Sequence, residues 1–128
     1  MKLLLDTHLL LWVAGSPEKL SSKALKLIDN PGNELYFSAA SFWEIAIKCK
    51  LDRPDFQVNA SVLRRGLLDN GYIELPVVSE HTIFLDNLPL LHKDPFDRLL
   101  VAQAISEGFT LLTTDGLIVQ YPAAVKKV

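Results

Sequence analysis

The stretch from His92 to Leu112 constrains the fold more than any other part of the chain. Pro95 fits the first position of a helix, and the helix predicted after it ends at Gly108. Apolar residues occupy most sides of this helix rather than a single face, so we expect it to lie deep in the protein. The apolar run from Phe109 to Leu112 follows at once and is typical of a buried strand.

Further short apolar runs alternate with stretches of helical spacing. Strands are predicted at Lys2–Leu5, Leu35–Ser38 and Tyr72–Leu75, with an edge strand within Ala124–Val128. Helices are predicted at Thr7–Ala14, Ala24–Ile28, from Ser41 onward, at Ser61–Asn70 and at Ser79–Leu88. Strands that alternate with helices favour an α/β domain with a largely parallel sheet.

The size and composition of the chain agree with one globular domain over residues 1–128. A chain of 128 residues with 49% hydrophobic residues can bury a core without a metal ion or a disulfide. Cys49 is the only cysteine and has no partner within the chain. The sequence shows no secretion signal and no apolar run near the ~20 residues of a membrane span. We therefore expect a cytoplasmic protein that does not associate with membranes.

Acidic residues stand at the places where ligands bind in α/β folds. Asp6 follows the first predicted strand, and Asp115 follows the last apolar run after two threonines. Glu44 and Asp97 are expected in the first turns of helices. Ligands of open parallel sheets bind at the carboxyl ends of the strands. These carboxylates are therefore expected to meet in one pocket at one edge of the sheet.

Such a cluster repels itself unless a proton or a cation sits within it. Two unit charges about 4 Å apart repel by about 4 kcal/mol at an effective dielectric constant of ~20. Oxygen ligands, with no His-x-x-x-His pair in the chain, favour Mg²⁺ or Mn²⁺ over Zn²⁺. A divalent ion held by acids can activate water and neutralise a pentavalent phosphate. The acids therefore indicate hydrolysis of phosphodiester bonds.

Structural roles are also available to most of these acids. Glu44 lies three residues after Ser41, which is the spacing of a capping box. Asp94 precedes a proline and fits a helix N-cap, and Asp115 precedes a glycine and fits a turn. Asp6 is the hardest to explain structurally, because an acid in a leucine-rich run destabilises the fold unless its charge is satisfied.

The other polar residues point less clearly to a function. The three histidines do not share the spacing of metal ligands, and we expect them at the surface or in packing contacts: His8, His81 and His92. Two short basic clusters could meet a phosphate backbone but are more typical of a solvated face: Arg64 with Arg65, and Lys48 with Lys50 and Arg53. The net charge of −2 argues against nucleic-acid binding, yet it becomes +2 if the four acids hold a metal. The net charge therefore does not show whether the protein binds nucleic acid.

Four motifs give the chain a resemblance to PIN-domain nucleases, and specifically to the VapC-type toxins of bacterial toxin–antitoxin pairs. The resemblance covers essentially the whole chain, and its longest motif is the most specific. The motifs are Leu3–Thr7, Ser38–Ile45, His92–Ala104 and Leu111–Asp115.

The resemblance implies a fold, an activity and a set of site residues. The fold is a PIN-like three-layer α/β sandwich, with a mostly parallel central sheet flanked by helices. Asp6, Asp97 and Asp115 match the family's metal-binding aspartates, and Glu44 matches the acid beside the metal. These four acids would be the catalytic residues of an endoribonuclease that depends on Mg²⁺ or Mn²⁺. Thr113 matches a Ser/Thr position beside the site, whereas Asp94 and His92 belong to the motif without an assigned role.

The resemblance also implies partners: an RNA substrate, a cognate antitoxin protein and a second copy of the chain in a homodimer. The main alternative is a catalytically inactive PIN-like module that binds RNA or protein. A phosphatase of the haloacid-dehalogenase kind is disfavoured, because His8 stands where that chemistry needs a second aspartate. Neither glycine-rich nucleotide-binding motif occurs in the chain.

Overall fold

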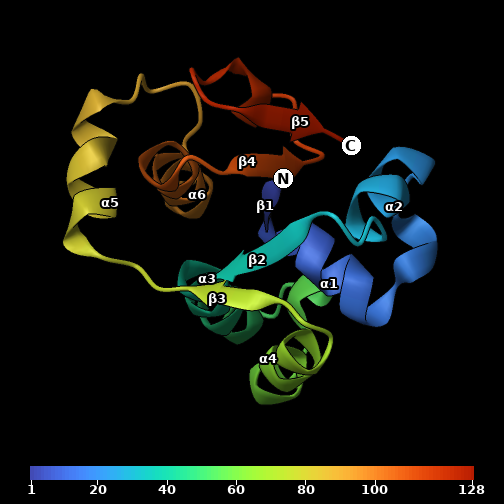
Figure 1. Cartoon of the computed structure of the whole chain (residues 1–128). Helices are drawn as coiled ribbons and strands as arrows, with labels where there is room; N and C mark the ends of the chain where they lie inside the picture. Colours follow the sequence, from blue (N-terminus) through green and yellow to red (C-terminus); the bar gives the residue numbers. More distant parts are fainter.

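Five parallel strands form the centre of the protein in the computed structural model, which describes residues 1–128 (Figure 1). Their order in the sheet is β3-β2-β1-β4-β5, which places β1 and β4 side by side in the middle. The strands are β1 (Lys2–Leu5), β2 (Glu34–Ser38), β3 (Ile73–Leu75), β4 (Thr110–Thr113) and β5 (Val125–Lys127). The predicted parallel sheet is confirmed, and its last strand lies at an edge as expected.

Six α-helices connect these strands. They are α1 (Thr7–Gly15), α2 (Ser22–Ile28), α3 (Ala39–Lys50), α4 (Ala60–Asp69), α5 (Ser79–Phe84) and α6 (Pro95–Glu107). The stretch predicted as one helix up to Leu88 divides into α5 and a short 3-10 turn over Leu85–Asn87. None of the helices combines the length and the apolar character that crossing a bilayer requires.

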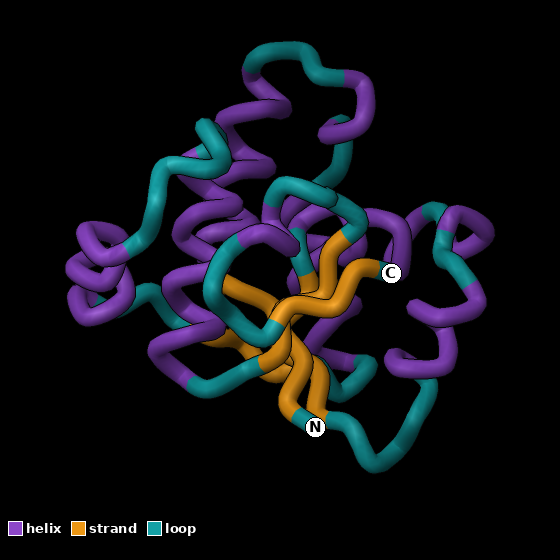
Figure 2. The backbone as a smooth tube through the Cα atoms, turned by 90° about the horizontal axis from the view of Figure 1, so that it is seen from above, coloured by secondary structure: helices purple, strands orange, loops and turns teal.

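Hydrophobic cores lie on both faces of the sheet, because alternate residues of a strand point to opposite sides. Leu3 and Leu5 of β1 pack into the core formed with α1, α2, α3 and α4. Leu4 between them packs into the other core, with α6 and with Leu111 of β4. Figure 2 shows the strands in the middle of the molecule with helices around them. The three-layer α/β sandwich expected from the sequence is therefore confirmed.

The predicted burial of α6 is also confirmed. Its seven buried residues run through most of its length: Phe96, Leu99, Leu100, Val101, Ala102, Gln103 and Ala104. One face packs on the sheet, and α5 and α3 cover other faces. This helix begins at Asp94, whose carboxylate accepts hydrogen bonds from the Phe96 and Asp97 amides at 2.8 and 3.3 Å. The N-cap role predicted for Asp94 is thus confirmed.

The start of α3 differs from the prediction. The helix begins directly after β2, because the Ser38 hydroxyl caps it by accepting a hydrogen bond from the Ala40 amide. Ser41 therefore lies inside the helix and Glu44 falls in the second turn instead of the first. The predicted capping box between Ser41 and Glu44 is wrong, and the Glu44 carboxylate is free to pair with Thr7 of α1 and with Lys48.

The conformations of two glycines predict opposite effects of replacing each by alanine. Gly108 ends α6 with φ of +72°, a left-handed conformation that an alanine would adopt at a cost of about 1 kcal/mol. Gly66 lies within α4, where an added Cβ meets no atom within 4 Å, so alanine should stabilise the helix by about 1 kcal/mol. We expect Gly108→Ala to lower the melting temperature and Gly66→Ala to raise it, each by roughly 4 °C. A thermal melt in which both variants shift in the same direction would contradict this assignment.

Candidate active site

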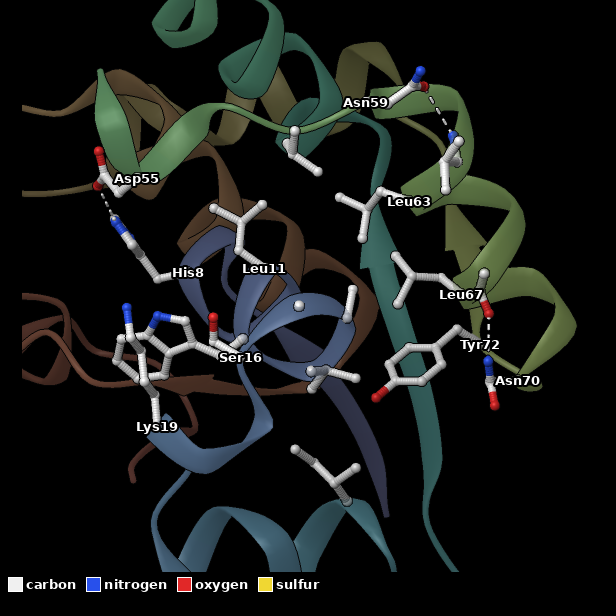
Figure 3. Close-up of a pocket in the computed structure, with 18 of the residues that line it drawn as sticks. His8, Leu11, Ser16, Lys19, Asp55, Asn59, Leu63, Leu67, Asn70 and Tyr72 are labelled. Atoms are coloured by element: carbon white, nitrogen blue, oxygen red, sulfur yellow. Dashed lines mark hydrogen bonds and ion pairs between the residues drawn. The ribbon is translucent and has the colours of Figure 1, made fainter. Parts of the chain in front are cut away.

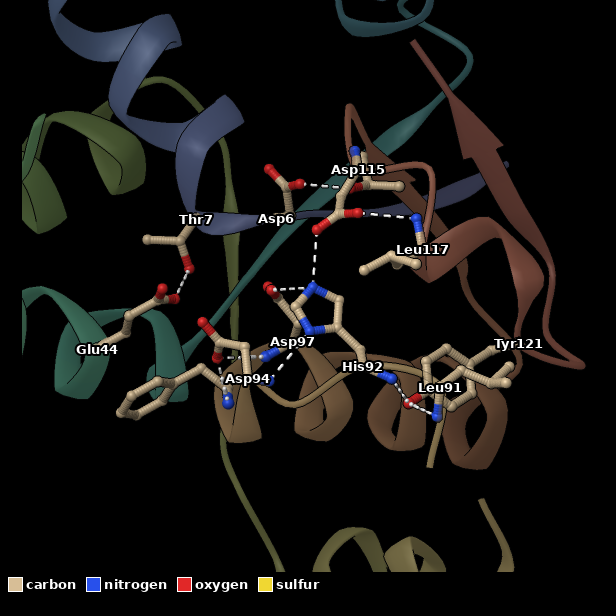
Figure 4. A network of polar contacts seen from close by, with 12 residues as sticks. Asp6, Thr7, Glu44, Leu91, His92, Asp94, Asp97, Asp115, Leu117 and Tyr121 are labelled. Carbon is tan, nitrogen blue, oxygen red and sulfur yellow. Dashed lines mark hydrogen bonds and ion pairs between the residues drawn. The ribbon is translucent and has the colours of Figure 1, made fainter. Parts of the chain in front are cut away.

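A polar pocket of about 430 Å³ lies at the carboxyl ends of β1 and β4. The register pairs Leu5 with Leu112, so the residues that follow these two strands emerge side by side. The other walls come from α3 and from the beginning of α6. All four acids singled out in the sequence line this pocket (Figure 4): Asp6, Glu44, Asp97 and Asp115. The strand order thus brings together carboxylates that are more than 100 residues apart in the chain.

Asp6 is almost completely buried, and both of its oxygens are hydrogen-bonded. Oδ1 accepts from the Leu9 amide at 2.9 Å, so Asp6 caps α1. Oδ2 accepts from the Thr113 hydroxyl at 2.6 Å. Burial nevertheless raises the pKa of the Asp6 carboxyl. The loss of hydration disfavours the charged form more strongly than these two hydrogen bonds favour it. Asp6 is therefore held in a defined position in the pocket.

Thr113 joins the two acids that follow the central strands. Its hydroxyl donates to Asp6 and accepts from the Asp115 amide at 3.0 Å. This placement beside the acids agrees with what the resemblance implied for Thr113. The fully buried threonine therefore links the end of β1 to the turn that follows β4, and it satisfies a buried carboxylate and an amide at once.

Replacing Thr113 by Val is expected to lower the free energy of unfolding by about 2 kcal/mol, because Val keeps the shape but leaves Asp6 Oδ2 without its donor. Thr110→Val on the same strand is the matched control, since the Thr110 side chain lies outside this network; its effect should stay within about 0.5 kcal/mol. Urea denaturation of both variants measures the difference. Equal stabilities would show that Thr113 does not support Asp6.

Asp97 occupies the first turn of α6, as expected, and lies among other acids. Its pKa is raised to about 7, first because it is buried and then because the carboxylates of Asp94 and Glu44 lie nearby. Asp97 Oδ2 lies 3.2 Å from His92 Nε2, but this contact does not offset the burial. Burial and the neighbouring carboxylates together therefore make ionisation of Asp97 unfavourable in the metal-free protein.

The pKa of Asp115 shifts in the opposite direction from that of Asp97. Burial alone would raise the pKa of the Asp115 carboxyl, but the hydrogen bonds that it accepts from His92 and from the Leu117 amide lower it. The distances are 2.8 Å to His92 Nε2 and 2.8 Å to the Leu117 nitrogen. Asp115 is therefore ionised at neutral pH and keeps its negative charge at the pocket mouth.

His92 is the residue of the site that the sequence did not predict. Its Nδ1 accepts from the Asp94 amide at 3.0 Å, so Nε2 is the nitrogen that carries the proton. Nε2 lies between Asp97 and Asp115, and the ligand atoms of these three residues all lie within 4.8 Å of one another. The expectation of a surface or packing histidine is wrong. Spacing along the chain could not show this contact, because Asp115 reaches His92 only through the fold.

Glu44 belongs to a second set of contacts at the other side of the pocket. Its side chain is buried, and Oε1 accepts from the Thr7 hydroxyl at 2.6 Å. Oε2 pairs with the ammonium group of Lys48, which also lies 3.2 Å from Asp94 Oδ2. The Lys48 side chain is only 15% exposed. The expectation that Lys48 belongs to a solvated basic face is therefore wrong.

The residues present fit a divalent metal ion. Asp97 and Asp115 bring carboxylate oxygens close together, and the oxygens of Asp6 line the same pocket. His92, whose Nε2 carries the proton, lies beside the Asp97 and Asp115 carboxylates as a donor and not as a metal ligand. The unfavourable burial of negative charge at Asp97 is what a bound cation would relieve. Carboxylate oxygens in a water-accessible pocket suit Mg²⁺ or Mn²⁺.

A second, more apolar groove of about 840 Å³ adjoins the acidic pocket. Figure 3 shows this groove from close by. Half of its lining residues are hydrophobic, and they come mainly from α1 and α4. His8 and Trp12 line both the groove and the acidic pocket, so the two are continuous. The Tyr72 hydroxyl in this groove is buried and has no hydrogen-bond partner, and its pKa is raised to about 12, first by burial and then by Asp29.

Comparison with known proteins agrees with this geometry. The family model described as "PIN domain" matches residues 3–123. Ribonuclease VapC22 of Mycobacterium tuberculosis is 29% identical over 114 residues, which cover 88% of this chain and 85% of that protein.

Two solved structures have the same fold. The first is VapBC2 from Rickettsia felis bound to a promoter DNA fragment, with a TM-score of 0.73 and 16% identity. The second is VapBC-1 from nontypeable Haemophilus influenzae, with a TM-score of 0.60 and 17% identity. In both comparisons the alignment covers 99% of this chain and 98% of the other. The family model matches nearly the whole length of the chain, and the chain therefore belongs to the PIN domain family.

Proposed function

We propose that this protein is a metal-dependent endoribonuclease that acts as the toxin of a toxin–antitoxin pair. The observation that carries the proposal is the convergence of Asp6, Glu44, Asp97 and Asp115 in one pocket of a PIN fold. The similarity to Ribonuclease VapC22 supports RNA as the substrate. A single PIN domain over residues 1–128 would then carry the whole activity, and we propose that it acts in the cytoplasm.

Asp6, Asp97 and Asp115 are proposed to hold Mg²⁺ or Mn²⁺, with Glu44 as the acid beside the metal. When bound there, such an ion supplies activation of a water molecule and neutralisation of charge on the phosphate. His92 approaches Asp97 and Asp115 from the side and orients their carboxylates. Groups that orient metal ligands in this way contribute to both affinity and activity.

The remaining contacts position the acids before the substrate arrives. Thr113 holds Asp6, and Thr7 together with Lys48 holds Glu44. The Asp97 carboxyl, with its pKa near 7, holds a proton in part of the metal-free molecules at neutral pH and must release it to bind a cation. The pocket is therefore preorganised for a cation and for the phosphate group that follows it.

Cleavage of a mixed cellular RNA pool by the purified protein tests the proposed activity. Wild type and Asp6→Asn would be incubated side by side with Mg²⁺, with Mn²⁺ and with EDTA. We expect fragments with either metal, none with EDTA, and none with Asp6→Asn, whose side chain keeps the cap of α1 but loses the charge. No cleavage by wild type with any divalent ion would support the inactive binding module instead.

The apolar groove supports an antitoxin as partner. Its continuity with the acidic pocket lets one bound segment cover both. The acidic lining would attract an Arg or Lys of the partner.

Expression of the chain in a bacterium tests the proposed toxicity. Wild type is expected to slow growth, whereas the Asp6→Asn variant is expected to leave growth unchanged.

A homodimer is supported by an apolar stripe along α3 and its C-cap. Trp43 and Ile47 of α3 and the C-cap residue Leu51 follow one another at helical spacing and are 60%, 37% and 67% exposed. Exposed large apolar residues that are contiguous on one helix face are typical of protein interfaces. Light scattering is expected to give twice the chain mass of 14.3 kDa for wild type. A charged residue in place of Ile47 should shift the protein to the monomer.

A further inference from the structure

Lys48 is the basic residue that enters the acidic pocket most fully. It lies one helical turn after Glu44 on α3, and its ammonium group pairs with Glu44 Oε2 and with Asp94 Oδ2. The aromatic rings of Phe56 and Phe96 flank it, with their centroids 4.9 and 6.0 Å from Nζ. Aromatic faces stabilise a cation at this range. The side chain is thus held in the pocket by charge and by packing.

The two carboxylates that Lys48 joins have no free oxygen. Glu44 Oε1 accepts from Thr7, and Asp94 Oδ1 accepts from the first amides of α6. The second oxygen of each carboxylate contacts Lys48. In contrast, Asp97 Oδ1 accepts no hydrogen bond from the protein, and its Oδ2 contacts only His92. Lys48 thus satisfies Glu44 and Asp94, whereas Asp97, on the other side of the pocket, keeps an oxygen without a donor from the protein.

We propose that Lys48 takes the place of a second divalent ion, so that the pocket binds one metal ion instead of two. The inference rests on the proposed function, because it concerns the same site. Two-metal nucleases place their ions about 3.5–4 Å apart and use carboxylates to hold both. Here the carboxylates available for a second ion, Glu44 and Asp94, already hold the ammonium group of Lys48, which also acts as a positioning residue for Glu44.

The charges agree with this arrangement. Burial alone would lower the pKa of the Lys48 ammonium, but its hydrogen bonds and charge interactions with Glu44 and then Asp94 raise it. Lys48 therefore stays positively charged at neutral pH. A second divalent ion would have to displace this charge or lie beside it, and like charges at about 4 Å repel by several kcal/mol.

Isothermal titration calorimetry with Mn²⁺ alone, without RNA, tests the proposal. Wild type is expected to bind one ion per chain. Lys48→Met, which keeps much of the length but removes the charge, is expected to bind two. The double variant Lys48→Met with Glu44→Gln is expected to return to one, because the second ion loses a carboxylate. Lys50→Met, an exposed lysine on the same helix, is the control and should still bind one.

Two ions per wild-type chain would overturn the proposal, whether or not Lys48→Met folds. One ion in a folded Lys48→Met, with unchanged affinity, would also overturn it, since a merely structural lysine leaves the metal count unaltered. Circular dichroism of each variant establishes that it is folded. Absence of any Mn²⁺ binding by wild type would instead refute the proposed metal-dependent function itself, so the two failures are distinguishable. Anomalous scattering from a Mn²⁺-soaked wild-type crystal gives the same count independently.

Discussion

Replacing Asp97 by Asn is expected to lower metal-dependent RNA cleavage by more than about 100-fold. Loss of a group that only orients a metal ligand costs about 10- to 100-fold in affinity or activity, and a proposed ligand should cost more. Asn has the shape of Asp and can still accept a hydrogen bond from His92, so the local structure should remain. The lost property is the negative charge of the Asp97 carboxylate.

Initial rates of RNA cleavage at several Mn²⁺ concentrations measure this effect. A rate that recovers at high Mn²⁺ would mean that Asp97 acts through metal affinity, and a rate that stays low would mean that it also orients the reacting groups. Asp69→Asn, an exposed aspartate at the end of α4, is the matched control and should cleave like wild type. Cleavage by Asp97→Asn within a few-fold of wild type would refute the proposed role.

The metal-free protein is expected to lose stability as the pH rises from about 4 to about 7. The folded state raises the pKa of Asp97 from 3.8 to about 7, so between these values the folded state binds more protons than the unfolded state. Stability falls with pH wherever the folded state binds more protons. A shift of about three units corresponds to roughly 4 kcal/mol, and this destabilisation is fully present above the folded pKa.

Asp97→Asn should remove this pH dependence and stabilise the metal-free protein at pH 8 by a few kcal/mol, because the side chain no longer carries a buried charge. Urea denaturation in EDTA at pH 5 and pH 8 measures both proteins. Wild type should gain stability when Mn²⁺ is added at pH 8, by about 2.7 kcal/mol at a hundredfold excess over Kd, and the variant should gain much less. A variant less stable than wild type at pH 8 in EDTA would contradict the electrostatic argument.

Much of the fold could be read from the sequence, because local patterns decide which segments become strands and helices. The apolar character of α6 on most sides predicted its burial, and seven of its residues are buried. The strand predictions agree closely, since short apolar runs bounded by turn residues have few other ways to bury themselves. The start of α3 was mispredicted because two serines can cap a helix here, and the end of β2 at Ser38 decides between them.

The contacts of the site could be predicted only in part. That Asp6 and Asp115 meet follows from a parallel sheet in which both stand just beyond strand ends. That His92 lies between Asp97 and Asp115, and that Lys48 points inward to Asp94, depends on segments 23 and 46 residues apart. No periodicity in the sequence extends across such separations. These contacts depend on how α3, α6 and the loop before α6 pack together.

The sequence by itself determined the alternation of strands and helices, the parallel sheet, and the presence of four acids near its carboxyl edge. Only the tertiary structure decided how these acids differ from one another. Asp97 and Asp115 are the same residue type, yet burial among other carboxylates raises the pKa of one, and hydrogen bonds from His92 and Leu117 lower that of the other. The pKa of a carboxyl group depends on its exposure to water, on nearby charges and on the hydrogen bonds that it accepts. These three conditions differ between the two aspartates only because of how the folded chain packs around them.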